Sequence, residues 1–92
     1  MNDSDSAALV EKIAGGDASA MMTLYDRTNR LLFGCVLRIL PENTSAEEAL
    51  LEAYTRFWRQ AGEYDPRGGT PLAWMMAITR TCAAGTGPRR RS

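Results

Sequence analysis

The chain has 92 residues, of which 45% are hydrophobic and 24% charged, a balance typical of a single soluble globular domain. It has no apolar run of about 18 residues, and its acidic, polar start is unlike a secretory signal, so we expect a cytoplasmic protein. Two widely separated cysteines and no histidine exclude the usual metal spacings and imidazole acid–base chemistry. We therefore expect no metal, no cofactor and no enzymatic activity.

The formal net charge is zero, but the charges are unevenly distributed along the chain. Residues 1–52 hold nine acidic and four basic side chains, whereas residues 53–92 hold seven arginines and two acidic side chains. Three of those arginines stand at 89–91. Chance plus a basic tail would give this pattern, and so would two halves that bind different partners.

Hydrophobic spacing predicts helices in the first part of the chain. Residues 1–5 are expected to be disordered, and a short helix is expected over Ser6–Ala14. Asp17 is a candidate cap for a second, longer helix from Ala18 to Leu40. Gly34 lies inside that helix and indicates either a close approach of another helix or a weak point.

The third predicted helix, from Ser45 to Arg59, is the most clearly amphipathic part of the chain. At about 100° per residue, six apolar residues fall on one arc, which we expect to enter the core. They are Ala49, Leu50, Ala53, Tyr54, Phe57 and Ala61. Leu51 and Trp58 lie at the edge of this arc. Thr44 and Ser45 each precede a glutamate by three residues, which offers two registers of a capping box.

An irregular loop with Asp-Pro and Gly-Gly pairs precedes a fourth predicted helix. Thr70 followed by Pro71 is a favourable helix start, and the helix is expected to run to about Ala84. It is apolar on nearly all sides, so it lies centrally in the core or has a partner. Residues 85–92 are expected to form a basic tail or linker. With no strand signal, the sequence predicts a small all-α, four-helix domain over residues 6–84.

Several short sequence motifs at fixed spacing carry a family resemblance. They are Gly15-Gly16-Asp17, Leu24-Tyr25, Leu37–Leu40, Ala46–Glu48, Arg56–Arg59, Tyr64–Gly68 and Ala73–Arg80. In this order, from about Leu9 to Thr81, the chain resembles region 2 of bacterial sigma factors of the extracytoplasmic-function (group 4) type. Such domains are helical, bind the clamp-helix coiled coil of core RNA polymerase, and melt and read the −10 promoter element on the non-template strand. An anti-sigma factor is a further partner that the resemblance implies.

The resemblance also implies which residues carry these functions. The positions matching the polymerase-binding surface are Glu48, Leu51, Glu52, Thr55 and Arg56. The positions matching the −10 contacts are Arg59, Tyr64, Arg67, Arg80 and Thr81. Arginines can neutralise phosphates, and an exposed tyrosine can stack on an unstacked base. For Tyr64 and Trp74, packing in the core is the alternative interpretation.

The sequence departs from the family pattern at two places that leave a second function open. Leu51 stands where glutamine is usual, and Cys82–Pro88 replace a basic helical continuation. The expected function is that of a transcription initiation factor domain. The alternative is a sigma-like interaction module that sequesters core polymerase or an anti-sigma factor without reading a promoter. A homodimer through the fourth helix, with Met75 and Met76 in the contact, is also open.

Overall fold

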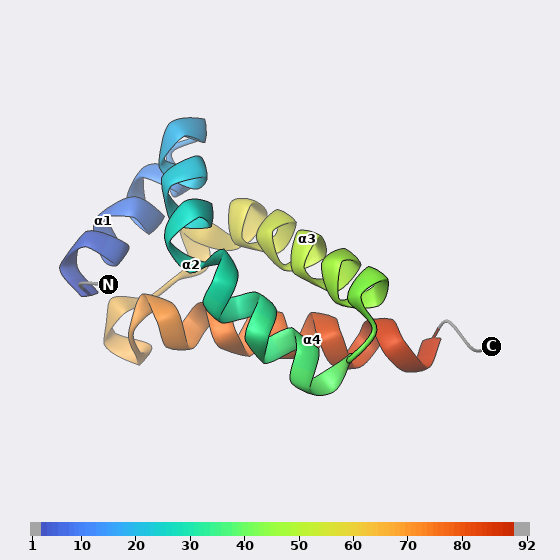
Figure 1. Ribbon diagram of the computed structural model, residues 1–92. Coiled ribbons are helices and arrows are strands. Elements are labelled where there is room, and N and C mark those ends of the chain that lie inside the picture. The colour runs from blue at the N-terminus through green and yellow to red at the C-terminus, as the bar shows by residue number, and fades with distance from the viewer. Residues whose placement is uncertain (1–2, 90–92) are drawn as a thin grey trace.

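The computed structural model describes the backbone of residues 3–89 and the side chains of residues 5–85. This part of the chain contains helices and no strand, which confirms the predicted all-α class. The elements are α1 (Asp3–Ala14), α2 (Ala18–Ile39), α3 (Asn43–Gln60), the 3₁₀ turns η1 (Ala61–Glu63) and η2 (Pro66–Gly68), and α4 (Pro71–Arg89). Figure 1 shows α2, α3 and α4 packed together, with α1 beside the start of α2 and the α3–α4 connection.

The start of α2 follows the prediction. Asp17 Oδ1 accepts hydrogen bonds from the backbone N–H groups of Ser19 (2.9 Å) and Ala20 (3.1 Å). These bonds satisfy two of the donors that a helix start leaves without an intrahelical partner. The hydrogen bond from the Ser19 side chain, together with that from Ala20, lowers the pKa of Asp17 and keeps the cap ionised.

The start of α3 corrects the prediction. The helix begins at Asn43, after Glu42, so neither Thr44 nor Ser45 is the cap residue of a capping box. Ser45 lies inside the first turn, and its hydroxyl donates to Glu42 Oε1 at 2.8 Å. The short connection after α2 therefore passes into α3 two residues earlier than the sequence pattern indicates, because this side-chain bond bridges the first turn.

Two helix ends also extend beyond their predicted limits. Helix α1 begins at Asp3, inside the segment expected to be disordered, and Ser6 is already buried, so packing holds its first turns. Helix α4 continues past Ala84 to Arg89, so the expected tail or linker is helical as far as it is described. Glycine lowers helix stability by only about 1 kcal/mol relative to alanine, and Pro88 stands in the last turn, where its missing N–H removes a single bond. Residues 1–2 and 90–92 of the predicted segments lie outside the described residues.

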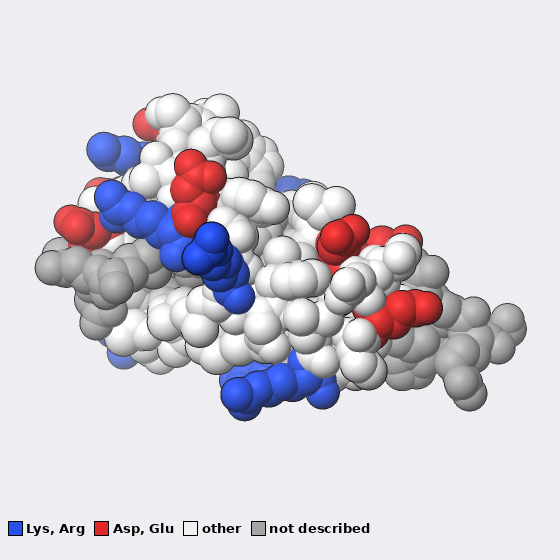
Figure 2. All heavy atoms as spheres, viewed as in Figure 1, with Lys and Arg blue, Asp and Glu red and all other residues white. Residues whose placement is uncertain are grey.

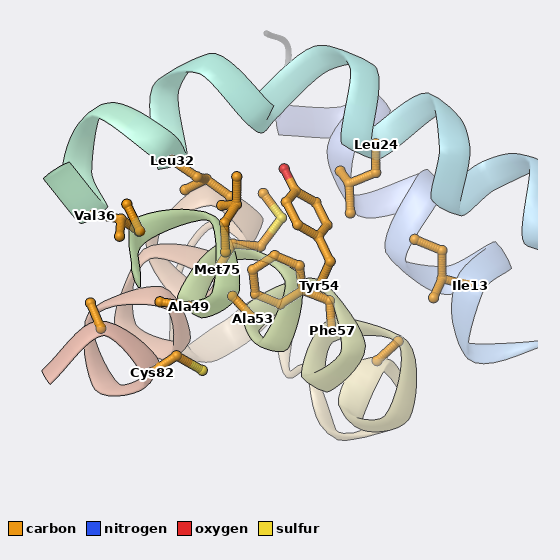
Figure 3. Close-up of a cluster of buried hydrophobic side chains, with 14 of the residues drawn as sticks. Ile13, Leu24, Leu32, Val36, Ala49, Ala53, Tyr54, Phe57, Met75 and Cys82 are labelled. Carbon is orange, nitrogen blue, oxygen red and sulfur yellow. The ribbon is translucent and has the colours of Figure 1, made fainter. Parts of the chain in front are cut away.

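The core forms where α2, α3 and α4 meet (Figure 3). All six residues of the apolar arc predicted on α3 are buried, which confirms the register of that helix. Phe57, at 1% exposure, packs edge-on against Tyr54 with ring centroids 5.0 Å apart. The buried Tyr54 hydroxyl is hydrogen-bonded to that of Thr28, whose hydroxyl also donates to the Leu24 carbonyl at 2.7 Å. Polar groups inside this core are thus paired across α2 and α3.

The two methionines of α4 that suggested a homodimer pack against the core of the same chain. Met75 is fully buried, and Met76 is half-buried and packs against the core. The two methionines that suggested a homodimer are therefore accommodated within one chain, and dimerisation through α4 gains no support. At Gly34 an added Cβ would meet no atom within 4 Å, so this glycine marks a weak point in α2 and not a close helix approach.

Candidate functional site

The residues expected to contact polymerase lie together on the solvent side of α3, and we call them the α3 face: Glu48, Leu51, Glu52, Thr55 and Arg56. Four of them are exposed and Arg56 is half-buried. The spacing of three and four residues places them on one side of the helix, opposite the arc that enters the core. The structure therefore brings all five predicted positions onto one accessible surface.

The α3 face is only loosely held by contacts within the chain. Arg56 Nη2 and Glu52 Oε2 form an ion pair at 3.0 Å. The side chain of Arg56 is 32% exposed to solvent and that of Glu52 is 48% exposed. Exposed pairs of this kind at i, i+4 are worth a few tenths of a kcal/mol, about 0.3–0.5. The Thr55 hydroxyl donates to the Leu51 carbonyl at 2.9 Å. A partner could break the Glu52–Arg56 pair at little cost and bind either charge.

An apolar groove of about 340 Å³ adjoins the α3 face, between α2 and α3. It is lined by Met21, Met22, Tyr25, Leu51, Tyr54, Thr55 and Trp58. Leu51 is 62% exposed, Met22 64% and Trp58 40%, so large apolar side chains cluster on the surface here. The sequence reasoning placed Leu51 and Trp58 at the edge of the buried arc but missed Met22. The available signal was that Met22 is a large apolar residue outside the row formed by Met21, Leu24, Thr28 and Leu32, which recur every three or four residues in α2.

A second depression, the loop pocket, lies where the α3–α4 connection meets α4, and its volume is about 370 Å³. It is lined by Glu63, Tyr64, Asp65, Gly68, Gly69, Thr70, Ala73, Trp74 and Ala77. The Tyr64 and Trp74 rings are tilted against each other, with centroids 5.5 Å apart. Both side chains are half-buried and pack against the core while lining the pocket, so core packing accounts for part of each ring and base stacking stays a prediction.

The loop beside this pocket is closed by its own hydrogen bonds. The Tyr64 hydroxyl donates to the Gly69 carbonyl at 2.7 Å. The Arg67 N–H donates to Asp65 Oδ1, and the Gly68 N–H donates to the Asp65 carbonyl, both at 2.9 Å. Thr70 then caps α4 as predicted, since its hydroxyl accepts from the Ala73 N–H at 3.1 Å. These bonds give a ten-residue connection one defined shape.

The predicted DNA-contacting residues are distributed around the loop pocket along two helices. Arg67 projects from the loop with its side chain 93% exposed, and its Nε lies 3.6 Å from Asp65 Oδ1. Arg80 and Thr81 are exposed and continue the face of α4 that starts at the pocket with Ala77. Arg59 is exposed in the last turn of α3, in line with the α3 face. It therefore lies between the α3 face and the connection that forms the pocket.

Charge is unevenly distributed on the surface as well as along the sequence. On the side seen in Figure 2, acidic side chains gather over the end where α2 passes into α3. Basic side chains lie mainly over the other end, near α1 and the first half of α2, with a further group at the lower edge of the view.

The described residues offer little for metal or thiol chemistry. Within residues 5–85 no group of three or more His, Cys, Asp or Glu side chains is arranged to hold a metal ion. Burial raises the pKa of the Cys82 thiol, which disfavours the reactive thiolate. None of the helices described is both long and apolar enough to cross a bilayer.

Comparison with known proteins places the fold and these surfaces in context. The model of the family described as Sigma-70 region 2 matches residues 24–84. An ECF RNA polymerase sigma factor SigK from Mycobacterium sp. (strain KMS) is 38% identical over 74 residues, which are 80% of this chain and 38% of that protein. The SigK proteins of Mycobacterium bovis (strain BCG / Pasteur 1173P2) and Mycobacterium tuberculosis (strain ATCC 25618 / H37Rv) are 37% identical over 75 residues, 82% of this chain and 40% of each relative. The chain thus spans about two fifths of the length of these curated relatives.

Proposed function

The chain belongs to the Sigma-70 region 2 family, as an extracytoplasmic-function type of this domain, and we propose that it binds core RNA polymerase and captures the −10 element of a promoter. The observation that carries the proposal is the presence of two separate accessible surfaces, the α3 face and the loop pocket, on one rigid core. A domain that links polymerase to DNA needs two such surfaces.

In this proposal the α3 face binds the clamp-helix coiled coil of the polymerase. Glu52 is exposed, Arg56 is half-buried, and the ion pair between them is weak, so both are available to charges on a partner helix. Charges at the border of an interface set its register and steer association, whereas a desolvated apolar centre supplies most of the affinity.

The adjoining apolar groove would supply that centre. Leu51 and Thr55 belong to both the α3 face and the groove, so a helix lying on the face would also cover Met22 and Trp58. Burial of apolar surface contributes about 25 cal/mol per Å², which makes this region the strongest contributor to the contact. Leucine at position 51 fits such an apolar centre.

The DNA step of the proposal uses the loop pocket and the arginines beside it. Arg67, in the loop, and Arg80, three residues after the pocket residue Ala77 on α4, are exposed and would neutralise phosphates of an unpaired strand. The pocket offers the faces of Tyr64 and Trp74 together with carboxylate and hydroxyl oxygens, which suits an extruded base. Arg59 and Thr81 extend this surface along α3 and α4. Phosphate contacts would position the strand, and the pocket would select the base.

The alternative function, a module that sequesters core polymerase or an anti-sigma factor without reading DNA, is favoured by one observation. The apolar groove alone would give a stable protein contact, whether or not DNA is bound. An anti-sigma factor would then compete with polymerase for the same groove.

Capture of purified core RNA polymerase by the immobilised 92-residue chain tests the first half of the proposal. Binding should occur without DNA and should become tighter when single-stranded promoter DNA is added, because the two ligands bind different surfaces of the same complex. Capture without any response to DNA would support the sequestering module. No capture at all would contradict the proposed function and the sequestering of polymerase, and would leave only an anti-sigma factor as the partner.

A further inference from the structure

The Tyr64 side chain links the two ends of the connection that forms the loop pocket. Its hydroxyl donates to the carbonyl of Gly69, five residues later, at 2.7 Å. Its ring is half-buried against Trp74, which belongs to α4. The ring is therefore anchored in the fold, and the hydroxyl fixes the far end of the loop relative to that anchor.

Gly69 is held in a conformation that only glycine adopts readily. Its φ is +149°, and an added Cβ would meet no atom within 4 Å, so backbone strain and not space excludes other residues there. The hydrogen bond from the Tyr64 hydroxyl is made to the carbonyl of Gly69 itself. Without that bond, the segment from Asp65 to Gly69 would lose the link between Gly69 and the ring that packs against Trp74 of α4, while the bonds that close the turn at Asp65 would remain.

We propose that Tyr64 is a positioning residue whose hydroxyl holds Gly69, and with it the wall of the loop pocket, in the shape that accepts a base. The inference rests on the proposed function and assigns to Tyr64 a role separate from stacking. A loop that is fixed before binding loses less conformational entropy when a base enters, so affinity for that base rises.

Tyr64→Phe isolates this role, because it removes the hydroxyl and keeps the ring and its contact with Trp74. Thr23→Val is the control, since it removes a hydroxyl that donates to the Ser19 carbonyl on α2, outside the loop pocket, the α3 face and the apolar groove. Gly69→Ala perturbs the same bond from its other end without altering Tyr64. In the 92-residue chain, amide hydrogen exchange of residues 65–69 should speed up roughly three- to tenfold in Tyr64→Phe, while exchange in the core of α3 stays unchanged.

The binding test uses the complex of the chain with core polymerase and a single strand selected by that complex from a random pool. Strands with one base removed at each position in turn identify the captured base, for which the parent should show a preference of roughly tenfold or more. Tyr64→Phe and Gly69→Ala should reduce that preference about three- to tenfold and leave the salt dependence unchanged, whereas Thr23→Val should retain it. A parent that prefers one base together with a Tyr64→Phe variant that keeps the full preference would overturn the positioning role alone. A parent that distinguishes no position would overturn base capture and the positioning role together.

Discussion

The two faces of α3 have the same helical backbone but opposite requirements. On one side, Ala53 and Phe57 are almost completely buried, so their side chains must fit the volume and shape of the core. On the other side, Glu52 and Thr55 are exposed, and their contacts within the chain contribute little to stability. The core side of α3 therefore determines whether the domain folds. The residues on its exposed side contribute little to folding, so they can be selected for binding a partner. Changes on the two sides should therefore separate stability from binding.

The largest effect is expected on the buried side. Phe57→Ala would leave a cavity among Tyr54, Trp74 and their neighbours, at a cost of about 3–5 kcal/mol. Small domains are stabilised by only about 5–15 kcal/mol in total, so much of the chain should unfold. Thermal unfolding followed by circular dichroism measures the loss. An unchanged melting curve would mean that the two sides of α3 are assigned the wrong way round.

The exposed side should respond in the opposite way. Glu52→Arg should shift stability by no more than about 0.5 kcal/mol, since it removes only an exposed ion pair. It should nevertheless abolish capture of core polymerase, because like charges placed in an interface cost several kcal/mol. Glu11→Arg, the same reversal on the exposed surface of α1, is the control and should leave capture intact. If folded Glu52→Arg binds polymerase as the parent does, the α3 face is not the polymerase contact.

The comparison also shows what the sequence pattern could and could not predict. Helical periodicity depends only on angular spacing, so it correctly assigned every residue of the buried arc from Ala49 to Ala61. The groove around Met22 depends on how α2 is rotated against α3, which no single helix encodes. The bond from Tyr64 to Gly69 depends on one backbone angle in an irregular loop, which residue spacing does not specify. Glycine and proline statistics ended α4 at about Ala84, whereas the helix continues to Arg89, because two glycines and a proline near its end cost too little to break it.

A smaller effect is expected at an exposed site with no tertiary contact. Gly34→Ala should raise stability by about 0.5–1 kcal/mol, because alanine restricts the unfolded chain and meets no neighbour in α2. Gly16→Ala is the matched control with the opposite sign, since φ at Gly16 is +92°. Urea denaturation of the two variants measures both changes. Destabilisation by Gly34→Ala would indicate a contact at this face of α2 that the fold does not show.

Titration of Tyr54 tests the boundary between the two sides of α3. Burial raises the pKa of Tyr54 to about 12 from 10.0, although the hydrogen bond with Thr28 opposes the shift. The folded state therefore keeps this proton when the unfolded chain releases it, so the stabilising contribution is full below pH 10 and is lost as the pH rises towards 12. Denaturation of the parent and of Tyr54→Phe across this range should show a steeper loss for the parent. Parallel pH profiles would place Tyr54 in contact with water.

We propose that one small domain presents a surface for polymerase and a separate surface for single-stranded DNA. The most direct test of this proposal is a titration of −10-like single strands against the free chain and against its complex with core polymerase, at several salt concentrations. We predict weak binding by the free chain and tighter binding by the complex. Each phosphate contacted on a single strand contributes roughly 0.7 to the slope of log binding constant against log salt concentration. Contact with about three phosphates would therefore give a slope near −2. A flat titration for both forms at low salt would contradict the claim and would leave only the sequestering module.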